Sequence, residues 1–136
     1  MYLKKLTPHD KPTWCVVAMC HNRTTCQVDD FLSNLPDNLA KDGVSMRRLL
    51  AYVADQGPQQ LPTEISHNIV DDIWQFTKGR LRVLWFYDGG KMVVCCHAFV
   101  KKGQKTPSSV IQTAKDCRGS YLLARARNHI EIIQGE

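Results

Sequence analysis

Two apolar stretches joined at Gly89-Gly90 constrain the fold of this chain more than any other feature. Residues 80–87 and 92–100 are rich in β-branched and aromatic side chains, which predicts two antiparallel strands and a tight turn. A two-residue turn would place Arg82 opposite His97, whereas a three-residue turn would shift the register and break that pairing.

The same hairpin predicts where a functional site would lie. Because side chains alternate across a strand, one face is the predicted core: Leu81, Val83, Trp85, Tyr87, Met92, Val94, Cys96 and Ala98. The other face is apolar near the turn, but it carries Arg82 and His97 toward the open end. A cationic loop at residues 101–105 follows directly, so we expect the site at this end of the hairpin.

The remaining elements follow from periodicity and from residues that end helices. Residues 13–20 and 69–76 each predict a strand, and residues 29–35 and 45–54 predict two helices that form a hairpin. Pro107 is placed to begin a helix that runs to about Arg125. Its apolar stripe is Val110, Ile111, Ala114, Cys117, Tyr121 and Leu122.

The length of the chain favours a single domain. The 136 residues suffice for one core and are too few for two ordinary ones. Residues 1–12 and 128–136 are expected to be tails, with residues 130–133 either an extra edge strand or part of the tail.

Charge is distributed unevenly along the sequence. Residues 1–77 hold seven Lys and Arg against nine Asp and Glu, whereas residues 78–136 hold eleven against four. Such a basic half indicates a polyanionic partner, most simply nucleic acid, because clustered cations release counterions from phosphates. The alternative is a basic face that is merely solvated.

Cysteine usage and hydropathy restrict the remaining function classes. The six cysteines include no C-x-x-C pair and suggest buried thiols, and the spacing of Cys20, His21 and Cys26 matches no standard zinc site. We therefore expect no metal and no cofactor. No stretch approaches the roughly 20 apolar residues of a membrane span, and no secretory signal begins the sequence, so we expect a cytoplasmic protein.

Several motifs in the second half carry a family resemblance. They are Trp74-Gln75-Phe76, the 82–86 strand Arg-Val-Leu-Trp-Phe, the run at 97–102 His-Ala-Phe-Val-Lys-Lys, the run at 104–107 Gln-Lys-Thr-Pro, and Ala114. With these motifs the chain resembles the phage-derived HigB-like family of the RelE/ParE toxin superfamily. The resemblance implies an α+β fold, with an N-terminal helical hairpin packed on an antiparallel sheet and a C-terminal helix.

The resemblance also implies an activity and partners. Similar proteins are toxins of type II toxin–antitoxin modules, and many cleave mRNA on the ribosome without a metal. The implied partners are the ribosome, mRNA and a cognate helix-turn-helix antitoxin. A non-catalytic module that binds an antitoxin or nucleic acid, and a ParE-like toxin that targets gyrase, remain as alternatives.

The residues predict roles in such a cleavage reaction. Arg82 could hold two phosphate oxygens, Lys101 and Lys102 could add positive charge, and His97 could transfer a proton, with Tyr121 a weaker choice. Arg82 could instead pair with Asp71 or Asp72, and His97 could be a structural residue. The remaining predicted RNA contacts are Lys78, Arg80, Lys105 and Arg118.

Overall fold

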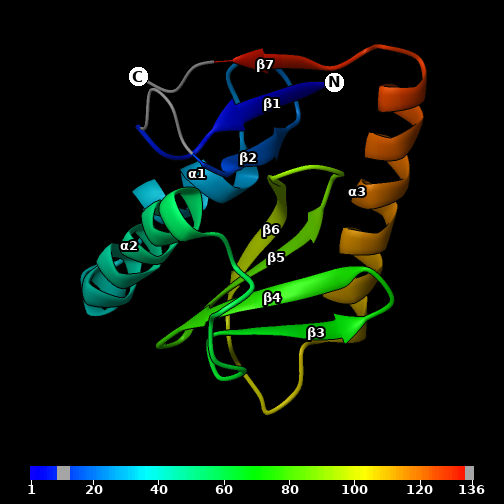
Figure 1. Ribbon diagram of the computed structural model, residues 1–136. Coiled ribbons are helices and arrows are strands. Elements are labelled where there is room, and N and C mark those ends of the chain that lie inside the picture. The colour runs from blue at the N-terminus through cyan, green and yellow to red at the C-terminus, as the bar shows by residue number, and fades with distance from the viewer. Residues whose placement is uncertain (9–12, 134–136) are drawn as a thin grey trace.

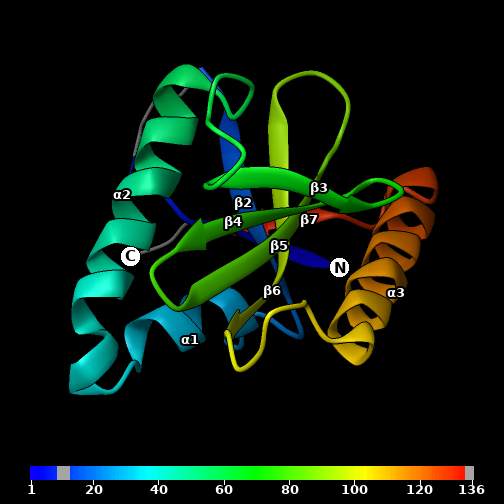
Figure 2. The same cartoon turned by 90° about the horizontal axis from the view of Figure 1, so that it is seen from below.

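The fold is a mixed β-sheet between two helical layers. The computed structural model describes residues 1–8 and 13–133 (Figure 1). The sheet has seven strands in the order β3-β4-β5-β6-β2-β1-β7. Helices α1 and α2 cover one face and α3 covers the other, as the second view shows (Figure 2). The elements are β1 (Tyr2–Lys5), β2 (Cys15–Cys20), α1 (Gln27–Ser33), the 3-10 turn η1 (Asp37–Leu39), α2 (Ala40–Gln56), β3 (Ser66–Val70), β4 (Ile73–Lys78), β5 (Leu81–Tyr87), β6 (Met92–Val100), α3 (Ser108–Ala126) and β7 (Glu131–Ile133).

The α+β class is confirmed, but two details of the predicted topology are wrong. Strands β1 and β2 precede the helices, so the chain does not begin with a helical hairpin. The sheet is mixed rather than antiparallel, because β2 pairs in parallel with β6 and β1 pairs in parallel with β7.

Both stretches expected to be tails contribute strands. Strand β1 lies between β2 and β7. Strand β7 is an edge strand, which was one of the two alternatives predicted for residues 130–133. Leu3 of β1 is fully buried, which explains why so short a segment joins the sheet. Residues 9–12 and 134–136 lie outside the described residues.

The predicted apolar stripes of the long helices are confirmed. Helix α2 buries the stripe that its spacing indicated, and α3 follows Pro107 and buries Ala114 and Tyr121. Helix α2 begins five residues before the predicted start, in a segment where Gly43 packs closely against Leu35. It ends at Gln56, and the φ of +82° at the following residue, Gly57, suits glycine.

The hairpin register differs from the two-residue-turn prediction. The Asp88 N–H donates to the Met92 carbonyl across a three-residue loop, and a bulge lies at Cys96. These two shifts pair Arg82 with Phe99, so the predicted pairing of Arg82 with His97 is wrong. The longer loop and the bulge together shift the register by two residues, so the side chains at the open end still point to the predicted faces of the sheet. Closer to the turn it is reversed, so Met92, Val94 and Cys96 pack on the α3 side.

Residues 69–76 contain the end of β3, a turn and the first residues of β4, so the single strand predicted there is wrong. Strands β3 and β4 are joined at Asp71, whose φ is +48°, and Asp72. The Asn68 side-chain amide donates to the carbonyls of Asp71 and Ile73 at 2.9 and 3.1 Å, which supports the turn. Two carboxylates at the centre of an apolar run were the only sign of it in the sequence.

Three further observations concern membrane-spanning helices, cysteine thiols and metal ligands. No helix within the described residues has both the length and the apolar character needed to cross a bilayer. All six cysteines are free thiols. In residues 1–8 and 13–133, no three His, Cys, Asp or Glu side chains cluster as metal ligands would.

Candidate functional site

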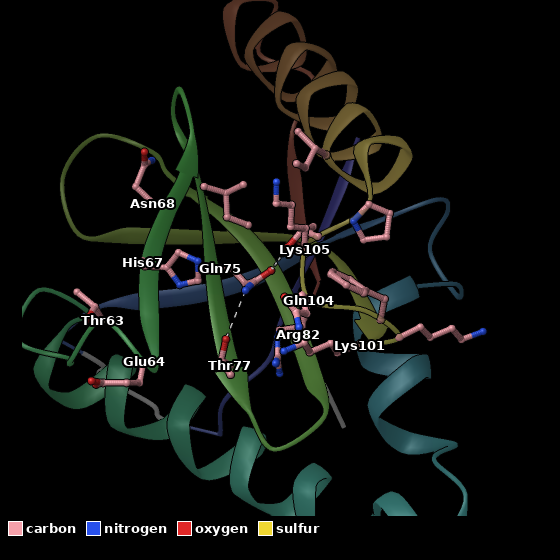
Figure 3. Close-up of a pocket in the computed structure, with 16 residues that line it drawn as sticks. Thr63, Glu64, His67, Asn68, Gln75, Thr77, Arg82, Lys101, Gln104 and Lys105 are labelled. Atoms are coloured by element: carbon pink, nitrogen blue, oxygen red, sulfur yellow. Dashed lines mark hydrogen bonds between the residues drawn. The ribbon is translucent and has the colours of Figure 1, made fainter.

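A pocket of about 540 Å³ opens on the α3 side of the sheet. Its walls come from β3, β4, β5, the end of β6, the 101–107 loop and the first turn of α3 (Figure 3). This is the open end of the β5–β6 hairpin, where the sequence placed the candidate site.

Polar side chains form the floor of this pocket in two cross-strand rows. Thr77 of β4 pairs with Arg82 of β5, and Arg82 pairs with Phe99 of β6. In the neighbouring row, His67 of β3 pairs with Gln75 of β4. Figure 3 shows Gln75 between His67 and Arg82, with the ring of His67 turned toward Gln75.

Arg82 is the buried cation of the pocket. The residue is only 9% exposed, and its Nη1 donates to the carbonyls of Gly79 and Leu81, both at 2.8 Å. Burial lowers the pKa of the guanidinium, and the charge of Asp42 partly opposes this shift. In the described part of the chain no carboxylate lies within ion-pair distance of Arg82.

The acidic residues proposed as structural partners of Arg82 are engaged elsewhere. Asp71 pairs with Lys115 at 3.4 Å and Asp72 pairs with Arg118 at 3.3 Å, so both hold the β3–β4 turn against α3. Arg82 is therefore oriented by backbone carbonyls, and the nearest opposite charge that acts on it, Asp42, forms no ion pair with it. A buried charge of this kind is costly unless an anionic ligand compensates it.

The cationic loop is held at both ends and forms the rim. The Lys101 N–H donates to the Arg80 carbonyl at 2.8 Å, and the Thr106 hydroxyl donates to Gln75 Oε1 at 2.7 Å. Between these anchors, Lys101, Lys102 and Lys105 are exposed and line the pocket. The pocket thus combines a guanidinium held at its floor with three exposed ammonium groups at its rim, a pattern suited to phosphate.

The histidine that lines the pocket is not the one that was expected there from the sequence. His97 does not line the pocket; it is half-buried beside Leu84 and stacks on Phe99 with ring centroids 6.1 Å apart. His67 lines the pocket instead. His67 was not predicted as a site residue, because the predicted strand began only at residue 69 and the pairing of His67 with Gln75 could not be deduced.

The other predicted contacts are dispersed around the pocket. Lys78 lines a groove beside α2, and the exposed Arg80 donates its backbone N–H to Asp42 at 2.9 Å. Arg118, a residue of α3, pairs with Asp72, as described above. The Tyr121 hydroxyl, far from the pocket floor, donates to Asp88, and burial raises the pKa of this tyrosine. Of the peripheral set only Lys105 lines the pocket.

His97 gives a pH-dependent stability. Burial lowers its pKa below the ordinary 6.5, so the unfolded chain binds this proton more readily than the native protein. The stabilisation is present above pH 6.5 and is lost as the pH falls toward the native pKa. We expect the unfolding free energy of His97→Gln, from urea titrations, to fall less steeply than that of the wild type between about pH 8 and about pH 5. His21→Gln, at an exposed loop position, is the matched control; equal slopes for all three proteins would contradict the prediction.

A family model matches the region of the chain that contains the pocket. A family model described as "Phage derived protein Gp49-like (DUF891)" matches residues 30–118. The matched region includes every residue that lines the pocket. No curated protein matches the chain.

Proposed function

Because this chain belongs to the Gp49-like family of phage-derived proteins, we propose that it is the toxin of a type II toxin–antitoxin module and that its pocket cleaves RNA. The observation that carries the proposal is Arg82, a buried guanidinium without a carboxylate partner among the described residues, beneath a rim of lysines. The HigB-like character inferred from the sequence motifs belongs to the same proposal. So do the ribosome, mRNA and a helix-turn-helix antitoxin as partners.

The proposed reaction uses the RNA itself as the nucleophile. The 2′-hydroxyl attacks the adjacent phosphorus, a 2′,3′-cyclic phosphate forms, and the bond to the 5′-oxygen of the next nucleotide breaks. Negative charge increases on the non-bridging oxygens, and Arg82 with Lys101 and Lys102 would stabilise it. The 2′-hydroxyl must lose a proton and the leaving 5′-oxygen must gain one, which requires a group that exchanges protons near neutral pH.

His67 replaces His97 as the proposed proton-transfer residue. It lines the pocket from β3, and histidine is the side chain most often used for proton transfer in catalysis. We expect His67→Gln to slow RNA cleavage by about 10²-fold or more, because one positioned acid or base contributes typically 10²- to 10⁴-fold. The rate is measured with a labelled RNA under single-turnover conditions.

His97→Gln serves as the matched control for this prediction. It removes a second half-buried histidine of the same sheet without touching the pocket lining. A cleavage rate that falls with His97→Gln and not with His67→Gln would overturn the assignment.

Induced expression in bacteria tests the proposed function as a whole. Growth, incorporation of labelled methionine, messenger integrity and the DNA-damage response are followed together. We expect translation to stop first and mRNA to be cut while DNA stays intact. DNA damage with intact mRNA would favour the gyrase-targeting alternative, and normal growth from a folded protein would favour the non-catalytic binding module.

A further inference from the structure

The outer face of α2 carries an exposed apolar and cationic stripe. Val44, Arg48 and Tyr52 follow one another at four-residue spacing, so they lie on one side of the helix. Val44 is 51% exposed and Tyr52 is 43% exposed, and these are two of the four large exposed hydrophobic residues in the described chain. Figures 1 and 2 show α2 at the side of the molecule remote from α3.

A groove lies on each side of this stripe. One, of about 500 Å³, runs between α1 and α2 and is lined by apolar residues that include Leu32 and Leu35. The other, of about 380 Å³, separates α2 from the segment before β3 and is lined by Leu61 and Ile65. Arg48 lines both grooves, so the two form one continuous surface across the helix.

The charged residues that line the two grooves are all cationic. Arg47 is compensated by Asp29 at 2.9 Å, but neither Arg48 nor Lys78 forms an ion pair within the described residues. No Asp or Glu lines either groove. An apolar patch bounded by uncompensated cations is complementary to an apolar segment bounded by carboxylates.

We propose that this face of α2 is the docking surface for an acidic amphipathic helix of a partner protein. Apolar side chains at positions i, i+3 or i+4 and i+7 of the partner would enter the grooves beside Val44 and Tyr52. Its Asp and Glu side chains would pair with Arg48 and Lys78. The surface lies on the α1/α2 side of the sheet, opposite the pocket of Arg82, so the proposal does not depend on the nuclease activity.

A displayed library of random segments tests this proposal without a known partner. Segments of about 16 residues are long enough to form a helix, and they are selected for binding to the full-length protein. We expect enriched sequences to combine helically spaced apolar residues with Asp and Glu. Their affinity, measured on synthetic peptides, should fall as salt is raised.

Variants of α2 locate the binding site. Val44→Asp and Arg48→Glu should each weaken binding of the enriched peptides by about tenfold or more, which corresponds to about 1.4 kcal/mol. Leu123→Asp, at a residue of α3 that is equally exposed at 51%, is the matched control and should bind normally. Val44→Ala replaces Val44→Asp if circular dichroism shows that the latter is unfolded.

Three outcomes would overturn the proposal. They are a selection that yields no binders, enriched sequences without acidic residues, and peptides that bind the α2 variants as tightly as the wild type. RNA cleavage by Val44→Asp and Arg48→Glu should be unchanged, so loss of docking and loss of the proposed activity are distinguishable.

Discussion

Arg82→Ala is expected to reduce RNA cleavage by about 10²- to 10³-fold, the usual consequence of removing one fixed donor from a site of developing negative charge. The guanidinium is held by two backbone carbonyls at the floor of the pocket, and no second arginine is among the described residues that line it. Arg82→Lys should recover only part of the rate, because an ammonium group cannot hold two phosphate oxygens in the geometry of a guanidinium. The measurement is the single-turnover rate on a labelled RNA.

Arg80→Ala is the control for this prediction. It removes the same side chain two residues away. Arg80 was a predicted RNA contact, but it is exposed and does not line the pocket, so the variant should cleave at close to the wild-type rate. Thermal unfolding of each variant shows whether the fold is kept. A folded Arg82→Ala protein that cleaves as fast as the wild type would contradict the assignment of this residue.

Leu3→Ala is expected to lower the free energy of unfolding by about 2–5 kcal/mol, the range for truncating a buried leucine. Leu3 is fully buried in the α3-side core and pairs with Met19 in β2, so its side chain cannot be removed without leaving a cavity. The change is measured by urea unfolding at a fixed pH.

Leu123→Ala provides the matched comparison for Leu3→Ala. It removes the same atoms from an exposed position of α3 and should change the free energy by no more than about 0.5 kcal/mol. The pair also tests whether β1 is part of the fold, because the region that matches the family model begins only at residue 30. Equal, small effects of the two substitutions would show that β1 is a dispensable tail.

The elements that were predictable are those with a strong local pattern. The stripe of α2, the helix after Pro107 and the two strands of the hairpin each repeat an apolar period over several turns or residues. Strand β1 was missed, and β7 was only one of two alternatives for its segment, because the two strands are four and three residues long, too short to show a period. Their strand structure depends on pairing with each other and with β2, which no local pattern records.

The residues of the candidate site likewise fall into those that could be predicted from the sequence and those that could not. Arg82 and the three lysines were found because they are adjacent in sequence to the hairpin that carries them. His67, Gln75 and Thr106 come from three separate segments, and their proximity depends on the β3–β4 register and on the hydrogen bond that anchors the loop. His97 does not line the pocket, because a turn one residue longer and a bulge at Cys96 altered which strand residues face one another.

The most direct test of the central claim is primer extension across a translated reporter mRNA in a cell-free bacterial translation system. Wild-type protein, Arg82→Ala and Arg80→Ala are compared, each with and without ribosomes. We predict cuts in phase with codons that require ribosomes, persist with Arg80→Ala and disappear with Arg82→Ala. Intact mRNA in every reaction with folded wild-type protein would contradict the nuclease function.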